Sequence, residues 1–406
     1  MNYNETLQWM FGRLPMYQRQ GKKAFKKNLN NILKLDKHLG FPSQEIEFIH
    51  IAGTNGKGSV SHILASVLQE AGYQIGLYTS PHLKCFRERI RINGQMIRKN
   101  CVINFIKRNH EFLEENQLSF FEMTFGLALE MFAKKKMDIA VIETGLGGRL
   151  DSTNIINPLL SIITNIGWDH TQMLGDSLEK IAFEKAGIIK KNTPIVIGKK
   201  QLETQKVFEE IALQKNVKLY YAESLQNFSN YPTDLKGIYQ RENVATALKA
   251  IEVLQNMSFK IDEVHIKQGL MNVVKNTGLR GRWEILRHHP MVIADTAHNK
   301  DALQIVLQQL SKMNYKKLRI ILSMVNDKDL DTILPLFPID AIYYFSKADI
   351  PRGLNAQVLQ KEAQKCGLTG KTYLSLTKAY EEALKDADKQ DLIFVGGSTF
   401  TVAEIL

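Results

Sequence analysis

A glycine-rich loop between an apolar stretch and a helical pattern constrains the fold of this chain most. Residues 49–60 read IHIAGTNGKGSV, and the apolar start has the character of a buried strand. Glycine lets the backbone turn its N–H groups inward where a Cβ would clash, and a helix start adds a positive dipole end. This order predicts a nucleotide-phosphate cradle in an α/β fold. The residues expected to contact ATP there are Gly53, Thr54, Asn55, Gly56, Lys57, Gly58 and Ser59.

Two side chains of this loop carry chemistry. Lys57 is expected against the β- and γ-phosphates of ATP, and the Ser59 hydroxyl is a candidate ligand for Mg²⁺. The usual P-loop has Ser or Thr directly after the lysine, whereas Gly58 intervenes here. The alternative interpretation is an ordinary strand-to-helix turn that contains three glycines.

The length and the charge of the chain limit the class of protein to which it can belong. At 406 residues the chain exceeds one compact core, so we expect two α/β domains. The N-terminus has no secretory pattern and no apolar run could span a bilayer, so we expect a cytoplasmic protein without membrane insertion. The net charge of +11 favours anionic partners, but no nucleic-acid recognition motif accompanies it. Three dispersed cysteines form no disulfide framework or metal site: Cys85, Cys101 and Cys366.

Basic residues are densest between Arg13 and Lys37. A solvated helix face is the simpler interpretation, and steering of an anionic ligand is the other. The members of this run, opposed only by Asp36, are Arg19, Lys22, Lys23, Lys26, Lys27 and Lys34.

Three further polar residues follow predicted strands. Ser80 ends one strand, Glu143 ends the buried strand 138–143, and His170 comes shortly after the strand 160–166. The carboxyl ends of parallel strands share the edge where α/β sheets bind ligands, so Glu143 is a candidate Mg²⁺ ligand. For Ser80 the alternative is a structural role in a turn, and for His170 it is a structural hydrogen bond.

The charged segment 86–94 is expected to be a mobile surface loop.

The periodicity breaks near residues 278–290, after which a second series of strands and helices begins. The alternation favours a smaller doubly wound domain. We therefore expect an N-terminal ATP-binding domain over 1–278, a linker over 279–290 and a C-terminal domain over 291–406.

Several motifs together resemble the folylpolyglutamate synthase and dihydrofolate synthase family of the Mur ligase superfamily. The resemblance covers nearly the whole chain and implies a P-loop-type doubly wound ATPase domain followed by a smaller Rossmann-like glutamate-ligase domain. The motifs are GTNGKGS at 53–59, SPHL at 80–83, ETGLGGRLD at 143–151, DH at 169–170, EKAGI at 184–188, QRENVA at 240–245 and DTAHN at 295–299.

The resemblance also implies roles for particular residues. Lys185 would carry a carbamate, although from the sequence alone it is an ordinary helix lysine. The implied Mg²⁺ ligands are Ser59, Ser80, Glu143, His170 and the carbamate of Lys185, and the implied catalytic residues are Lys57, Glu143, His170 and Lys185. Phe121 and Asp151 would line the pterin pocket. The remaining implied ATP contacts are Asn243 to adenine, Arg282 to phosphate, Asp295 to ribose, and His298 on the nucleotide side.

The implied reaction is an ATP-dependent ligation in folate biosynthesis and one-carbon metabolism. L-Glutamate would be joined to dihydropteroate, to reduced folates, or to both, through an acyl phosphate, by a monomeric enzyme. A P-loop kinase acting on a small anionic metabolite and a basic nucleic-acid-binding ATPase are the alternatives. The chain departs from the family pattern at Arg280, Thr296, Lys300 and Ser323, which all lie in the expected linker and second domain.

Overall fold

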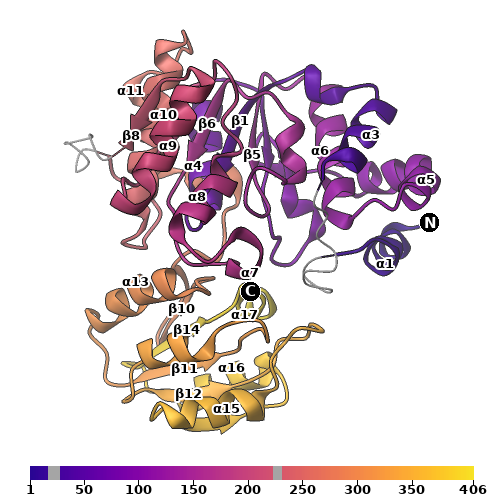
Figure 1. The fold of residues 1–406 in the computed structure, drawn as a ribbon. Coiled ribbons are helices and arrows are strands. Elements are labelled where there is room, and N and C mark those ends of the chain that lie inside the picture. The colour runs from indigo at the N-terminus through magenta and orange to yellow at the C-terminus, as the bar shows by residue number, and fades with distance from the viewer. Residues whose placement is uncertain (17–27, 223–230) are drawn as a thin grey trace. The chain divides into compact units, whose positions relative to one another are not determined.

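The computed structural model describes residues 1–16, 28–222 and 231–406 and divides into two compact units (Figure 1). The first unit is formed by Met1–Asp234 and Gln240–Leu279, and the second by Leu235–Tyr239 and Arg280–Leu406. Most of the basic run named above, Arg19 to Lys27, lies outside the described residues, while Lys34 is exposed on a helix.

The first unit is built on an eight-stranded sheet in the order β4-β3-β2-β5-β1-β6-β7-β8. The six strands from β2 to β8 are parallel, and β3 and β4 are antiparallel at one edge. The strands are β1 (Glu47–Ala52), β2 (Ile75–Tyr78), β3 (Ile90–Ile92), β4 (Gln95–Met96), β5 (Ile139–Glu143), β6 (Leu160–Ile163), β7 (Ile195–Ile197) and β8 (Leu219–Tyr221).

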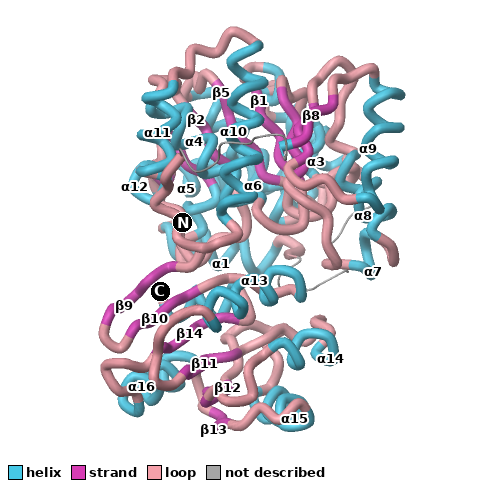
Figure 2. Tube along the Cα trace, turned by 90° about the vertical axis from the view of Figure 1, so that its left-hand side faces the viewer, coloured by secondary structure: helices cyan, strands magenta, loops and turns pink. Residues whose placement is uncertain are grey.

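Helices cover both faces of this sheet because its connections run in both directions along the sheet. The crossover from β1 to β2 runs one way along the sheet, and those from β6 to β8 run the other way, so right-handed connections place their helices on opposite faces. One group is α4 (Lys57–Glu70), α10 (Gln240–Asn256), α11 (Glu263–Met271) and α12 (Val273–Thr277). The other is α6 (Phe120–Lys134), α8 (Leu178–Ala186) and α9 (Leu202–Lys215), with α1 (Tyr3–Arg13), α3 (Asn30–His38) and α5 (Lys99–Glu115) outside α6 (Figure 2).

The segment 86–94 is not the surface loop predicted from its charge. Phe86–Arg89 forms a 3-10 turn, and Ile90–Ile92 is β3, paired antiparallel with β2. Asn93 and Gly94 both have positive φ values, 46° and 74°, and join β3 to β4. An Asn-Gly pair after alternating apolar residues is a hairpin signal, and it outweighs the charged side chains here.

The second unit has a six-stranded sheet in the order β13-β12-β11-β14-β10-β9, parallel except for β9. Its strands are β9 (Glu284–His288), β10 (Met291–Ala294), β11 (Leu318–Leu322), β12 (Ile342–Phe345), β13 (Gly370–Thr372) and β14 (Leu392–Gly396). Its helices are α13 (Lys300–Ser311), α14 (Leu330–Ile333), α15 (Ala356–Lys365), α16 (Leu376–Asp386) and α17 (Thr399–Ile405).

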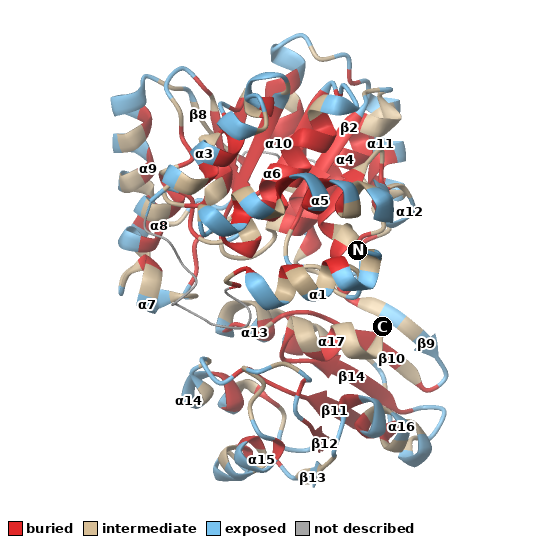
Figure 3. Cartoon of the chain, turned by 90° about the vertical axis from the view of Figure 1, so that its right-hand side faces the viewer, coloured by how far each residue is buried: buried red, intermediate tan, exposed pale blue. Residues whose placement is uncertain are grey.

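Alternate residues of β11 point into two different cores of this unit. Ile320 packs with α13 and α15, whereas Ile321 packs with α16 and α17. Buried residues follow the central strands of each sheet (Figure 3). The expected class, two doubly wound α/β units, is confirmed. The expected linker over 279–290 differs from the structure, because β9 lies within it and pairs with β10.

No helix among the described residues is long and apolar enough to cross a bilayer.

Candidate active site

The loop after β1 turns at two glycines whose backbone and surroundings exclude a side chain. Gly53 has φ +146° and Gly56 has φ +85°, values that other residues rarely adopt. A Cβ on Gly53 would collide with the hydroxyl of Thr164, and one on Gly56 would collide with the side-chain amide of Asn243. The loop is therefore packed closely against Thr164 and Asn243.

Two residues after β6 that were not among the predicted site residues, Thr164 and Asn165, hold this loop. The Thr54 N–H donates to the Asn165 carbonyl at 2.9 Å, and the Asn55 N–H donates to Asn165 Oδ1 at 2.9 Å. The Thr164 hydroxyl donates to the Asn55 carbonyl at 2.6 Å. The sequence does contain a signal for Thr164 and Asn165, because polar residues that follow a buried strand lie at the ligand-binding edge of the sheet.

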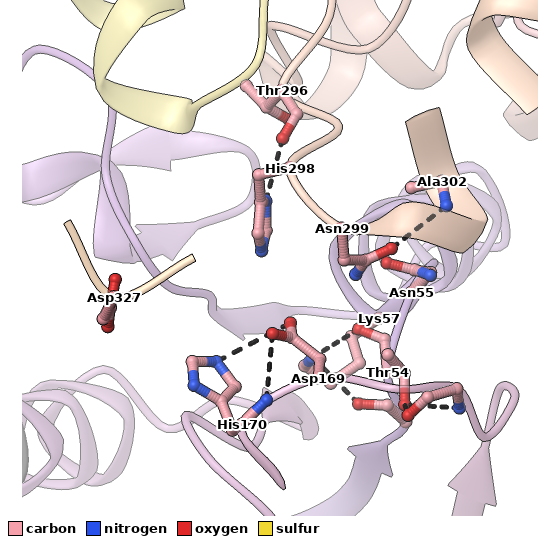
Figure 4. Close-up of polar contacts among 12 residues, drawn as sticks. Thr54, Asn55, Lys57, Asp169, His170, Thr296, His298, Asn299, Ala302 and Asp327 are labelled. Atoms are coloured by element: carbon pink, nitrogen blue, oxygen red, sulfur yellow. Dashed lines mark hydrogen bonds and ion pairs between the residues drawn. The ribbon is translucent and has the colours of Figure 1, made fainter. Parts of the chain in front are cut away.

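Two lysines reach the same backbone oxygen. Lys57 Nζ donates to the Gly53 carbonyl at 3.0 Å and to the Thr54 carbonyl at 3.2 Å. Lys185, on α8, donates from Nζ to the Gly53 carbonyl at 2.8 Å and is only 4% exposed. Burial, followed by the charge of Lys57, lowers the pKa of Lys185 to about 7. Lys185 is thus not an ordinary solvated helix lysine. Figure 4 shows Lys57 and Thr54 within the loop.

Ser59, in the first turn of α4, is buried and is oriented by α10. Gln240 donates from Nε2 to Ser59 Oγ at 3.2 Å, and Asn243 donates from Nδ2 to Gln240 Oε1 at 2.8 Å. All three side chains are at most 5% exposed. The structure therefore brings the candidate metal ligand Ser59 and the candidate adenine contact Asn243 into one chain of hydrogen bonds, through a glutamine that the sequence analysis missed.

Glu143 is a buried carboxylate at the end of β5, the strand next to β1. It accepts a hydrogen bond from the Ser80 N–H at 3.1 Å. Among the described residues, no group of three or more His, Cys, Asp or Glu side chains could hold a metal ion by itself. Mg²⁺ bound with ATP keeps waters and phosphate oxygens and needs only one or two carboxylates. The oxygen donors of Glu143 and Ser59 fit such an ion.

His170 begins α7 (Thr171–Leu174) with a left-handed backbone, φ +51°. Its N–H donates to Asp169 Oδ1 at 3.0 Å, and its Nε2 lies 3.7 Å from Asp169 Oδ2 (Figure 4). The side chain is 30% exposed. His170 follows β6 as predicted, and its described ion-pair partner is the adjacent carboxylate.

Phe121 and Asp151 meet at the turn that follows β5. Asp151 Oδ2 accepts hydrogen bonds from the N–H groups of Gly145 at 2.9 Å and Leu146 at 2.8 Å. A Cβ on Gly145 would lie 2.6 Å from Cζ of Phe121, so the ring packs directly on the turn. Burial raises the pKa of Asp151. The two residues predicted to line a pterin pocket thus both contact this turn, and we name this pair the Phe121–Asp151 wall.

The second unit gathers its predicted residues at the loop after β10. Asp295 accepts hydrogen bonds from the Tyr239 hydroxyl at 2.5 Å and from the N–H groups of Trp283 and Ala297 at 2.8 Å each. Burial raises the pKa of Asp295. Tyr239 was missed because it precedes Asp295 by 56 residues.

The neighbouring predicted residues converge on Thr296. Arg282 donates from Nη1 to the Thr296 hydroxyl. His298 Nδ1 lies 3.0 Å from the Thr296 carbonyl (Figure 4). Thr296 is one of the departures from the family pattern, and its hydroxyl accepts the hydrogen bond from Arg282. The other departures lie apart from this contact: Arg280 pairs with Glu284 at 2.6 Å, Ser323 bonds Thr401 at 2.7 Å, and Lys300 opens α13.

Family models match both units of the chain. The Mur ligase middle domain matches residues 51–271, and the Mur ligase glutamate ligase domain matches residues 281–399. The dihydrofolate synthase/folylpolyglutamate synthase of Bacillus subtilis is 31% identical over 99% of this chain and 98% of its own length. The Escherichia coli protein of the same name is 31% identical over 88% of this chain and 85% of its own length. The chain also matches, at 31% identity, half the length of a probable bifunctional folylpolyglutamate synthase/dihydropteroate synthase of Haloferax volcanii.

Solved structures of proteins with the same names have a similar fold. E. coli FolC in complex with DHPP and ADP has a TM-score of 0.88 at 28% identity, covering 100% of this chain and 97% of that one. A bifunctional folylpolyglutamate synthase/dihydrofolate synthase with Mn, AMPPNP and L-glutamate bound has a TM-score of 0.84 at 27% identity, covering 100% and 97%. The chain belongs to the folylpolyglutamate synthase/dihydrofolate synthase family of Mur ligases.

Proposed function

We propose that this chain joins L-glutamate to a pteridine-bearing carboxylate, either dihydropteroate, a reduced folate, or both. As a member of its family it is an ATP-dependent ligase that uses a divalent cation. The observation that carries the substrate assignment is the placement of two features after neighbouring strands. The phosphate cradle follows β1, and the Gly145–Leu146 turn that contacts Phe121 and Asp151 follows β5, so both lie at one edge of the sheet.

The chemistry requires a carboxylate to become an acyl donor. The terminal phosphoryl group of ATP passes to a carboxylate oxygen, which gives ADP and an acyl phosphate. The amino group of L-glutamate then attacks the acyl carbon, phosphate leaves with the electron pair of the C–O bond, and the amine loses a proton to give the amide. Catalysis of such transfers rests on positioning and on neutralising phosphoryl charge, which Lys57 supplies from the cradle.

The residues proposed to hold Mg²⁺ are Ser59, Ser80, Glu143, His170 and a carbamate of Lys185. Mg²⁺ in that place would neutralise charge on the transferring phosphoryl group. Lys185 as an ammonium cannot bind a cation, whereas its carbamate offers oxygen donors. A buried amine with a pKa of about 7 is partly neutral near pH 7, which is the form that reacts with CO₂.

Contacts to the remainder of ATP are proposed from the other predicted residues. Asn243 would contact adenine, Asp295 the ribose and Arg282 the phosphate, with His298 on the nucleotide side. The buried carboxylate of Asp295 and the guanidinium of Arg282 are groups that recognise hydroxyl and phosphate oxygens. We further expect the enzyme to act as a monomer in the cytoplasm.

The test is ADP release by the purified chain with ATP, Mg²⁺ and L-glutamate, with dihydropteroate in one reaction and tetrahydrofolate in another. Products are identified by mass. Turnover on both substrates means a bifunctional synthase, and turnover on one assigns a single activity. ADP release that is independent of glutamate and leaves a phosphorylated product would instead support the kinase alternative.

A further inference from the structure

A buried chain of hydrogen bonds runs from the centre of β1 to the Phe121–Asp151 wall. His50 Nε2 lies 2.8 Å from Thr153 Oγ1, and the Thr153 hydroxyl donates to Asp151 Oδ1 at 2.6 Å. His50 and Thr153 are 0% exposed and Asp151 is 4% exposed. The chain connects a strand residue to a turn that follows a different strand.

Thr153 determines which group donates in each hydrogen bond of this chain. A hydroxyl has one proton, and Thr153 gives it to Asp151, so its oxygen accepts from Nε2–H of His50. The imidazole is neutral, because burial and the charge of Lys190 lower the pKa of His50 to about 3. Its Nδ1 has no hydrogen-bond partner among the described residues.

A histidine at position 50 lowers the stability of the fold, because its Nδ1 is buried without a partner among the described residues. Its neighbours Ile49 and Ile51 are fully buried apolar residues of the same strand, and an apolar side chain at position 50 would leave no polar atom unpaired. The polar chain does, however, hold the Asp151 carboxylate in one orientation, because the hydroxyl and the N–H of Thr153 both donate to its Oδ1.

We propose that His50 and Thr153 are positioning residues that hold the Asp151 carboxylate on the Gly145–Leu146 turn and so shape the wall of the ligand pocket. Asp151 Oδ1 accepts from the hydroxyl of Thr153 and also from its N–H at 3.0 Å. Oδ2 is left to hold the two N–H groups of the turn. The identity of the ligand rests on the proposed function, whereas the effect on the turn does not.

Thr153→Val tests this directly, because it keeps the shape of the side chain and removes the hydroxyl. With an active wild type, we expect the KM for dihydropteroate or tetrahydrofolate to rise about tenfold, the cost of a lost buried hydrogen bond, while the KM for ATP changes less than about twofold. Thr153→Ser keeps the hydroxyl and should reverse most of the rise. The matched control is Thr193→Val, another buried threonine, whose hydroxyl donates to the Pro158 carbonyl at 3.0 Å.

Hydrogen–deuterium exchange gives a readout that does not need substrate. The amides of residues 145–148 should exchange about tenfold faster in Thr153→Val than in wild type or Thr193→Val. His50→Leu, the second variant if Thr153→Val does not fold, should change exchange in the same direction. Equal exchange in all variants, or an unchanged KM in an active enzyme, would overturn the proposal. Faster exchange in a protein without glutamate-dependent turnover would retain the positioning role and reject the folate substrate.

Discussion

Lys57 and Lys185 donate to one atom, the carbonyl oxygen of Gly53, at 3.0 and 2.8 Å, although 132 residues separate Lys185 from that glycine. Two ammonium groups on one neutral acceptor repel each other in a buried site. Burial and this repulsion favour the uncharged amine of Lys185. Conversion of Lys185 to a carbamate would replace repulsion by attraction, which gives the proposed modification a physical cause.

The first prediction concerns this modification. Lys185 gains a proton as the pH falls through about 7, so carbamate occupancy should fall from pH 8 to pH 6 and rise with added bicarbonate. ¹³C NMR with labelled bicarbonate should show a carbamate signal in wild type that Lys185→Arg lacks, and the variant should lose about a hundredfold in kcat.

Lys249→Arg is the matched control for this experiment. Lys249 is also buried, at 9% exposure, but it pairs with Glu252 at 2.5 Å on α10. The control should keep both the signal and the activity. A Lys185→Arg enzyme with wild-type turnover would refute the carbamate assignment.

The second prediction concerns the cradle glycines. Gly53→Ala and Gly56→Ala place a Cβ against Thr164 or Asn243 at strained φ values, so the loop must move away from its position. A displacement of about 1 Å can cost about a hundredfold, and we expect kcat/KM for ATP to fall by about that much.

Gly12→Ala serves as the control for the added methyl group. Gly12 lies in α1 with no atom within 4 Å of an added Cβ, so this variant should be fully active and slightly more stable. Steady-state kinetics measures kcat/KM for ATP, and calorimetry measures the stability of each variant. Comparable ATP kinetics in all three variants would contradict a phosphate cradle.

The third prediction concerns Glu143. Glu143→Gln removes the charge that a divalent cation needs but preserves an acceptor for the Ser80 N–H. We expect kcat to fall about a hundredfold and the Mg²⁺ concentration for half-maximal rate to rise.

Glu130→Gln is its matched control, because Glu130 is a buried carboxylate of α6 that pairs with Arg108 and Lys134 at 2.6 Å each. It should alter stability and leave the Mg²⁺ dependence unchanged. If the two variants shift the Mg²⁺ dependence equally, Glu143 has no special part in binding the ion.

The fourth prediction follows from the neutral His50. Its pKa of about 3 in the folded state lies below the ordinary value near 6.5 of an unfolded chain, so the unfolded state binds more protons between these values. The free energy of unfolding should therefore fall as the pH falls below 6.5, by about 2 kcal/mol between pH 6.5 and 5 from this one group.

Urea unfolding at several pH values measures the effect. His50→Leu should lose that part of the acid sensitivity, so the stability of the wild type relative to the variant should fall toward pH 5. Parallel pH profiles for the two proteins would show that His50 is not held neutral.

The fifth prediction concerns a departure from the family pattern in the second unit. The Ser323 and Thr401 hydroxyls, both buried, bond each other at 2.7 Å. Ser323→Ala should lower the free energy of unfolding by about 1–2 kcal/mol. In a double-mutant cycle with Thr401→Val the two losses should be less than additive, measured by urea unfolding, and strict additivity would mean that the bond contributes nothing.

Local patterns in the sequence predicted much of the fold and part of the site. The strand–glycine loop–helix order placed the cradle, the strand ending in Glu143 placed a carboxylate beside it, and the alternation after residue 290 predicted the second sheet. These features succeed because backbone propensity, strand burial and turn chemistry act over a few neighbouring residues. The motif resemblance supplied the family, which the comparisons confirm.

Only the tertiary structure decided which distant residues meet. Three sets of hydrogen bonds join residues that are more than a hundred positions apart. They link Lys185 to Gly53, Thr164 and Asn165 to the cradle, and His50 to Thr153. A lysine in a helix or a histidine in a strand has no local mark of such a partner, because its neighbours in space are determined by strand order and helix packing rather than by its neighbours in sequence.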